Sequence, residues 1–269
     1  MRTMAIIRLG VLALMTGSAT VWASPPPLRV AIEDLKSCND ITAGYCRALP
    51  ARLSAYGGAA VTPITQALPT LPQAAQILAV GALTSIEGKA ATRGLATLCI
   101  QAPTPIRRLV IPALAKRNGP LVVTTLLRCL KDTKPFIRSL CAETLGVATP
   151  KHQRARVARA LIRGARDAVL SVRVTCIESL GYLGQKLALR TLLDRLRNGS
   201  PPEQTAALRA FRFLPDKRAI EPCMTLMEWA DPTLSKTIGK TLESLTGQRF
   251  GTNYSLWKAW WDENRGPAR

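Results

Sequence analysis

The sequence predicts an all-α protein, an α-solenoid in which antiparallel helix pairs stack one after another. The first observation is composition: 47% of the 269 residues are hydrophobic, as in folded chains, but only 5% are aromatic, which argues against a sandwich or barrel with a ring-filled core. The second is an internal repeat whose period has the length of a helix pair. The third is the recurrence of helix-capping residues and prolines just before the predicted first helix of a unit.

Residues 1–23 have the features of a signal peptide. Arginines precede an apolar run at residues 9–19, and a Val-Trp-Ala sequence, with small residues at the positions that a signal peptidase recognises, ends at Ala23. We therefore expect cleavage after Ala23 and a periplasmic or secreted protein. The alternative is an uncleaved membrane anchor, although the apolar run is shorter than the roughly 20 residues that span a bilayer.

Residues 24–41 form a proline-containing linker and N-terminal segment, and residues 42–72 a degenerate first repeat. Arg52 stands in this repeat where a leucine is expected, which is typical of a cap with a polar outer face. An exported protein meets an oxidising compartment, so the seven cysteines are candidates for disulfides. Cys38 and Cys46 lie in a loop-like stretch and are a candidate pair; the alternative is that they stay free. The other five occupy apolar positions of predicted helices, where cysteine is usually a small buried side chain.

The repeat array spans residues 42–250. Its landmarks are three arginines, each preceded by Ile or Val and followed seven residues later by Leu: Arg107, Arg138 and Arg173. The same column continues at Gln76, Gln204 and Ser235, and its intervals are equal except for a longer one between Arg138 and Arg173. A second apolar column nineteen residues after the anchors makes each unit a pair of helices. The extra length of the longer interval falls at residues 149–152, between two helices, where an insertion is tolerated.

The anchor arginines are predicted to hold neighbouring repeats together. Asp132 and Asp167, with Asn198 in the same column, stand six residues before an anchor and are of helix-capping types. An arginine one helical turn from a capping aspartate of the preceding linker can join repeats through charge-assisted hydrogen bonds. The predicted structural set is Arg107, Asp132, Arg138, Asp167 and Arg173, and contact with a ligand is the alternative role for its arginines.

Residues 251–269 form a Trp-rich C-terminal tail. Leu256, Trp257, Trp260 and Trp261 make an apolar stripe on one face of a predicted helix. We expect this stripe to cap the exposed edge of the last repeat. The alternative is an aromatic anchor at a membrane or ligand site.

The anchor motifs carry a resemblance to a known family. Asp132-x5-Arg138 and Asp167-x5-Arg173 are each followed by an Ala/Leu-rich helix, as at residues 141–146. This pattern resembles the short HEAT-like repeat of bacterial proteins, also called the lyase-type HEAT repeat. The resemblance implies a right-handed solenoid with a concave protein-binding face, and it rarely implies catalysis.

The same resemblance extends to the C-terminal tail and has clear departures. The segment at residues 245–251 and the tryptophans after it are similar to a tail that follows such arrays in bacterial envelope proteins. Gln76 and Gln204 replace the anchor arginine in two units. Pro112 falls inside a predicted first helix and predicts a kink there.

The charge distribution supplies the functional hypothesis. The formal charge is +20, and residues 103–197 hold 19 Lys or Arg against five Asp or Glu. Four arginines spaced by 3, 4 and 3 line one helix face, with a fifth beside them: Arg156, Arg159, Arg163, Arg166 and Arg154. Because like charges so placed repel each other, this basic stripe predicts the docking of an acidic protein surface, which we expect on the concave face. The alternatives are anionic envelope polymer or lipid head groups, and a merely solvated face.

Other functions are disfavoured by residues that the sequence lacks. Tyr182 is the only aromatic residue between residues 137 and 210, which argues against stacking on bases, and export leads away from the genome, so nucleic acid is not expected as a partner. His152 is the only histidine, which removes most histidine chemistry and any metal site with two imidazoles. We therefore expect a monomeric binding scaffold that is not an enzyme and needs no cofactor or metal.

Overall fold

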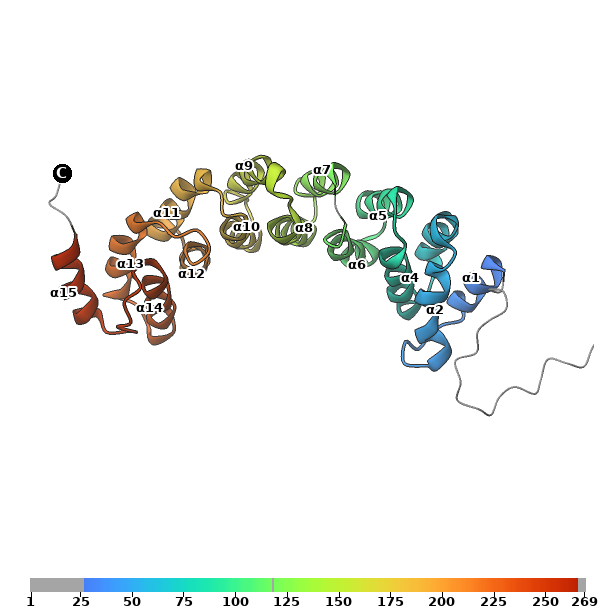
Figure 1. Cartoon of the computed structure of the whole chain (residues 1–269), viewed down its shortest axis with the longest axis horizontal. Helices are drawn as coiled ribbons and strands as arrows, with labels where there is room; N and C mark the ends of the chain where they lie inside the picture. The colour runs from blue at the N-terminus through green and yellow to red at the C-terminus, as the bar shows by residue number, and fades with distance from the viewer. Residues whose placement is uncertain (1–26, 118, 266–269) are drawn as a thin grey trace, which may run out of the picture.

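The computed structural model describes residues 27–117 and 119–265, and its regular elements in these ranges are helices (Figure 1). The predicted signal peptide and its cleavage site after Ala23 lie outside the described residues. Within the described ranges, no helix has the combined length and apolar character needed to cross a membrane. The α-helices are α1 Leu28–Lys36, α2 Gly44–Ser54, α3 Val61–Ala67, α4 Gln73–Ser85, α5 Lys89–Gln101, α6 Thr104–Leu114, α7 Pro120–Cys129, α8 Pro135–Ala148, α9 Arg154–Gly164, α10 Leu170–Leu183, α11 Leu189–Asn198, α12 Pro201–Phe211, α13 Ile220–Met227, α14 Pro232–Thr246 and α15 Tyr254–Asn264.

The helices form the two layers of an arch (Figure 1). The inner, concave layer consists of α4, α6, α8, α10, α12 and α14, and the outer layer of α5, α7, α9, α11 and α13. The three anchor arginines lie on the inner helices α6, α8 and α10. Each inner helix packs directly against the next inner helix along the chain. The prediction of an all-α, helical-repeat fold is therefore confirmed.

The inner helices of the curved arch are in close contact with one another. One apolar core, rich in Ala and Leu, runs between the layers. On its inner side, a Cβ added to Gly146 would lie 2.9 Å from the Ser179 side chain, and one added to Gly181 would lie 2.5 Å from the Cα of Ala210. The absence of a side chain at these two positions brings α8, α10 and α12 together on the inner side. Shorter spacing on one side of a stack bends it toward that side.

The expectation that Asp132 and Asp167 cap helices is wrong in detail. The N-cap residues of α8 and α10 are Lys134 and Val169, each two residues further on. Each aspartate instead closes the turn before its helix, where its carboxylate accepts the backbone N–H of Lys134 (2.8 Å) or Val169 (2.9 Å). Short polar side chains stabilise such turns in the same way that they stabilise helix starts, so both arrangements use the same residue types.

Three other local features of the sequence can be located in the structure. Asn198 is the last residue of α11, and Ser200 is the N-cap of α12, in a capping box with Glu203. Pro112 lies inside α6, in its last turn. Residues 149–152 lie between α8 and α9, and the last two of them belong to a short 3-10 turn.

The tail ends the stack with α15. Trp257 is fully buried, and its indole N–H donates to the Gly251 carbonyl at 2.9 Å. The rings of Phe250 and Trp260 stand edge-on to it, with centroid distances of 4.9 and 6.3 Å. Because α15 contacts α13, these rings cover the C-terminal side of the last helix pair.

Candidate functional site

The three anchor arginines each bind a carboxylate of the following repeat. Arg107 Nη2 lies 2.5 Å from Asp132 Oδ2. Arg138 donates to both carboxylate oxygens of Asp167, from Nε at 2.8 Å and from Nη2 at 2.7 Å. This hydrogen-bonded ion pair lowers the pKa of Asp167, so the carboxylate is charged at neutral pH. The geometry is that of a cross-repeat clamp rather than of a ligand contact.

The direction of these contacts differs from the expected one. The sequence argument paired each arginine with the aspartate side chain of its preceding linker, but that linker contributes backbone carbonyls instead. Arg138 Nη1 donates to the Asp132 carbonyl at 2.9 Å, and Arg173 Nη1 donates to the Asp167 carbonyl at 2.9 Å. Each aspartate thus joins two arginines, because its side chain turns toward the earlier repeat and its carbonyl faces the later one.

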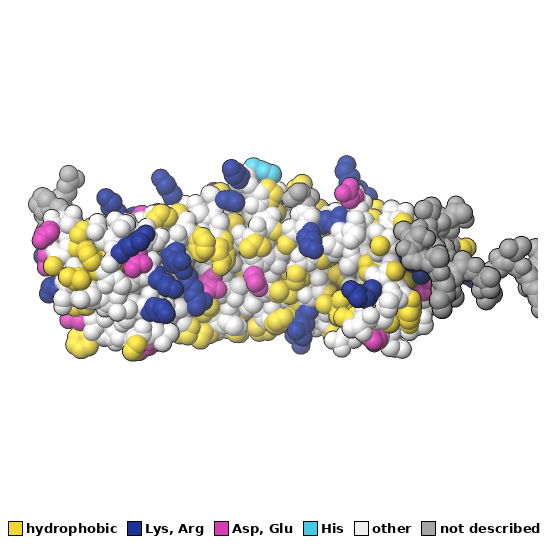
Figure 2. Space-filling view, turned by 60° about the horizontal axis from the view of Figure 1, so that its bottom comes forward, with side chains coloured by type: hydrophobic (Ala, Val, Ile, Leu, Met, Phe, Trp, Pro, Cys, Tyr) yellow, Lys and Arg dark blue, Asp and Glu magenta, His cyan; other side chains and the backbone are white. Residues whose placement is uncertain are grey.

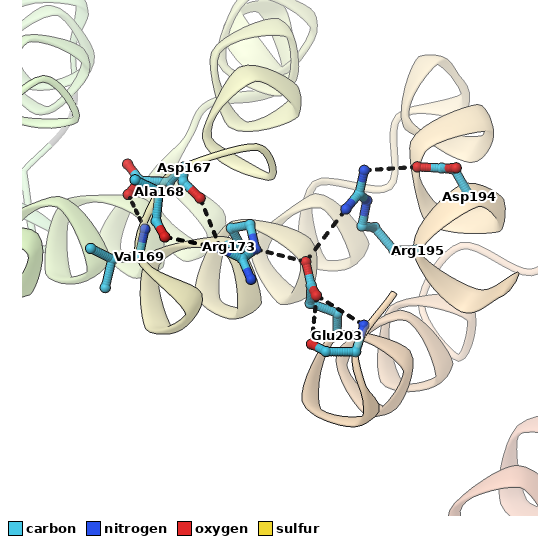
Figure 3. A network of polar contacts seen from close by, with 8 residues as sticks. Asp167, Ala168, Val169, Arg173, Asp194, Arg195 and Glu203 are labelled. Carbon is cyan, nitrogen blue, oxygen red and sulfur yellow. Dashed lines mark hydrogen bonds and ion pairs between the residues drawn. The ribbon is translucent and has the colours of Figure 1, made fainter. Parts of the chain in front are cut away.

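Glu203 replaces the missing aspartate in the next linker (Figure 3). Asn198 stands in the aspartate column, and the ion pair of Arg173 goes instead to Glu203 Oε1, at 2.8 Å. The backbone N–H and hydroxyl of Ser200 donate to the other oxygen, at 3.0 and 2.5 Å. Burial alone would raise the pKa of Glu203, but the contacts from Ser200 and Arg173 outweigh it and lower the pKa to about 2. The Ser-x-x-Glu capping box is the sequence signal that could have identified Glu203.

The basic stripe lies on the convex side of the arch, which corrects the expectation of a concave docking face. Its helix, α9, belongs to the outer layer (Figure 1). Arg156, Arg159, Arg163 and Arg166 are exposed, and no carboxylate among the described residues pairs with any of them. Arg154 differs, since it is half-buried and donates to the carbonyls at the ends of α8 and α10. Its geometry is that of a contact between repeats rather than of a partner-binding residue.

Two stripe residues face a groove of about 520 Å³ between α7 and α9. Arg156 and Arg163 line one side, and Arg128 and Lys131 line the other. The groove has one carboxylate in its lining, Asp167, which Arg138 already binds. Its floor is partly apolar, so an occupant would meet both cations and aliphatic surface. The field in the groove therefore favours an anionic group.

Arg128 and Lys131 were missed by the sequence argument. Helical spacing reveals only cations that share one face of a single helix, and these two lie on α7 or just after its end, not on the helix of the stripe. Arg128 precedes Arg156, and Lys131 precedes Arg163, by nearly the length of a repeat. In register with the repeat, Arg128 and Lys131 correspond to Arg163 and Arg166, which follow them by the length of the longer interval, so comparing the same columns of consecutive repeats could have found both.

The concave side carries a second basic cluster near the C-terminus. Figure 2 shows Lys and Arg side chains gathered over the C-terminal part of this side. Arg212, Lys240 and Arg249 line a pocket of about 420 Å³ there, together with Glu243. Beside it the exposed ring of Phe213 stands edge-on to Tyr182, with centroids 4.8 Å apart. These cations come from the last two inner helices and the segments after them, outside the zone that the sequence argument emphasised.

The cysteines fall into two classes. A disulfide joins Cys38 and Cys46 at a Cα–Cα distance of 5.9 Å, which connects the end of α1 to α2. The other five are buried thiols: Cys99, Cys129, Cys141, Cys176 and Cys223. Across the described ranges, His, Cys, Asp and Glu side chains form no group of three that could hold a metal ion.

The comparisons with known proteins concern the fold. No family model matches the sequence, and no curated protein matches it. Among solved structures, that of human deoxyhypusine hydroxylase in complex with glycerol is similar at 18% identity and a TM-score of 0.44, covering 71% of this chain and 75% of that one. The crystal structure of an engineered protein is similar at 15% identity and a TM-score of 0.47, covering 82% of this chain and 96% of that one.

The expectation that the protein is not an enzyme is corrected by the first of these similarities. Human deoxyhypusine hydroxylase, to which the chain is similar, is an enzyme. At 18% identity the similarity gives this chain neither a reaction nor a substrate.

Proposed function

We propose that this protein is an exported, monomeric scaffold of the bacterial HEAT-like type, with a right-handed helical stack, which docks an acidic protein surface. The groove between α7 and α9 is its binding site, and Arg128, Lys131, Arg156 and Arg163 are the residues that meet the partner. The observation that supports this most is the charge of the groove: four cations, none paired with a carboxylate of the described residues, face one carboxylate that is already bound.

The physical argument rests on where charge is left uncompensated. Ion pairs within the stack use the cations at the anchor positions, whose carboxylate partners are at most 16% exposed. The groove cations have no such partner in the part of the chain that the structure describes, so their field extends into solvent and steers an acidic surface toward the convex side. Leu127, Leu130 and Ala160 in the lining supply apolar area that a protein partner can bury.

The alternative occupant, an anionic envelope polymer or lipid head group, differs in its dependence on salt. A flexible polyanion is held by charge alone, so its binding should fall steeply and uniformly with ionic strength. A protein interface that buries the apolar lining should persist at moderate salt.

The test is co-purification of tagged mature protein, residues 24–269, from envelope extract at low and at moderate salt. The variant changes Arg128, Arg156 and Arg163 to Glu. The matched control changes three exposed cations on outer helices elsewhere, Lys89, Arg93 and Arg190, to Glu. Both variants have the same net charge, so a difference between them reports on the groove alone.

A defined protein retained at moderate salt by the wild type and the control, but lost by the groove variant, is the expected result. Recovery only of heterogeneous anionic material at low salt would support the polymer instead. Equal retention of a partner by both variants would refute the groove as the site.

A further inference from the structure

Three thiols meet inside the stack where α5, α7 and α8 come together. The Sγ atoms of Cys99 and Cys129 are 3.0 Å apart, and the Cys141 thiol interacts with both. All three residues are at most 2% exposed. Cys99 belongs to the second helix of one repeat and Cys129 to the second helix of the next, so a bond between them would cross a repeat boundary.

The surroundings distinguish Cys129 from the other two cysteines. Hydrogen bonds from Cys141 and Cys99 lower the pKa of Cys129, against the effect of burial and with further help from the Arg107 guanidinium. Burial is the main factor that raises the pKa of Cys141. Arg107 is itself held in place, because it donates to the Cys99 carbonyl at 2.7 Å and to Asp132. A neighbouring guanidinium stabilises the thiolate, which is the nucleophilic form of cysteine.

We propose that Cys99 and Cys129 form a dithiol–disulfide site that closes a covalent link between neighbouring repeats, with a small-molecule disulfide as oxidant. The Cys129 thiolate attacks one sulfur of the oxidant, RSSR, which forms a mixed disulfide and releases one RS⁻. Cys99 loses its proton and attacks the Cys129 sulfur, which forms the protein disulfide and releases the second RS⁻. The two protein thiols are oxidised, the oxidant is reduced, and the two protons leave with the two RSH products.

Reaction with the oxidant requires local opening, because Cys129 is only 2% exposed. Cys129 is the last residue of α7, and helix ends open locally more readily than helix centres. Arg128 and Lys131, which flank it in sequence, line the basic groove on the other side of α7. The link would therefore fasten the α7 wall of that groove to α5, whatever the groove binds.

The test begins with the reduced wild-type full chain, whose Cys38–Cys46 disulfide is followed separately. The protein is incubated with glutathione disulfide, denatured in an alkylating agent, and digested for peptide mass mapping. The expected result is a peptide pair linked through Cys99 and Cys129, with Cys141, Cys176 and Cys223 alkylated. Five alkylated thiols, or pairs distributed among all five cysteines, would overturn the proposal.

Variants separate chemistry from packing. Cys223→Ser is the matched control, since this thiol is fully buried and has no thiol neighbour among the described residues. It should leave the Cys99–Cys129 link intact, whereas the double variant Cys99→Ser/Cys141→Ser, which removes both neighbouring thiols, should stop the reaction at a mixed disulfide on Cys129 that adds the mass of one glutathione. Arg107→Lys should slow oxidation of the wild-type pair; an unchanged rate would refute activation by the guanidinium. Oxidation should also raise the Tm of the wild type by several degrees and leave that of Cys99→Ser/Cys141→Ser unchanged.

Discussion

The close approach of α10 and α12 makes Gly181→Ala the sharpest test of the packing argument. The added Cβ would lie 2.5 Å from the Cα and 3.0 Å from the carbonyl oxygen of Ala210. These are backbone atoms, so α12 itself must move, because no side chain can turn aside to make room. Overpacking of this kind costs about 1–3 kcal/mol. The helix propensity of alanine returns about 1 kcal/mol, so we expect a net loss of up to about 2 kcal/mol.

The matched control is Gly81→Ala in α4. There the added Cβ has its nearest neighbour, Pro50, at 4.0 Å, so the substitution gains helix propensity without a clash. We expect it to stabilise the fold by about 0.5–1 kcal/mol. Urea unfolding followed by circular dichroism measures both variants against the wild type. If Gly181→Ala is as stable as Gly81→Ala, the inner helices are not held by backbone contact and the account of the curvature fails.

Three further predictions concern the ion pairs and the tail. The pKa of Glu203 is about 2 in the fold, against an ordinary value of 4.5. The contribution of this carboxylate to stability is therefore complete above pH 4.5 and is lost as the pH falls from there through 2. The free energy of unfolding of Glu203→Gln should depend less on pH in this window than that of the wild type, and an equal dependence would contradict the ion pair. Arg138→Ala leaves Asp167, 15% exposed, without its cation and should lower the free energy of unfolding by about 2–3 kcal/mol. The side chain of Arg209 is 59% exposed, so Arg209→Ala should change the free energy of unfolding by less than about 1 kcal/mol. Urea titrations that show equal losses for the two variants would refute the clamp. Trp257→Ala should lower the free energy of unfolding by about 3–5 kcal/mol, because it removes a fully buried side chain. An unchanged thermal melting curve would mean that α15 does not close the stack.

The anchor arginines show which contacts a local sequence pattern predicts and which it does not. Their regular spacing placed each of them on the first helix of a repeat, and the nearby aspartates pointed to contacts between repeats. Which aspartate each arginine binds was predicted in the wrong direction, because side chain and carbonyl of one residue point to different neighbours. That choice is made by the turn before the helix, whose geometry the residue types alone do not specify.

The candidate site depended on tertiary structure to a greater degree. Four stripe arginines were visible as exposed charges at helical spacing, but their place on the convex side follows from which layer of each pair lies inside the arch. Arg128 and Lys131 join them only because α7 and α9 are neighbours in the outer layer. The same holds for Cys99 and Cys129, which lie in different repeats although their Sγ atoms are 3.0 Å apart.

The sequence by itself determined that this protein is all helical, that its helices come in repeating pairs, and that its central repeats are strongly basic, because periodicity, turn chemistry and charge are properties of single segments. Tertiary structure alone decided the side on which the stripe lies, the groove that it shares with α7, and the meeting of three thiols. Those features depend on how close neighbouring repeats pack, which small residues such as Gly146 and Gly181 govern through contacts across the stack.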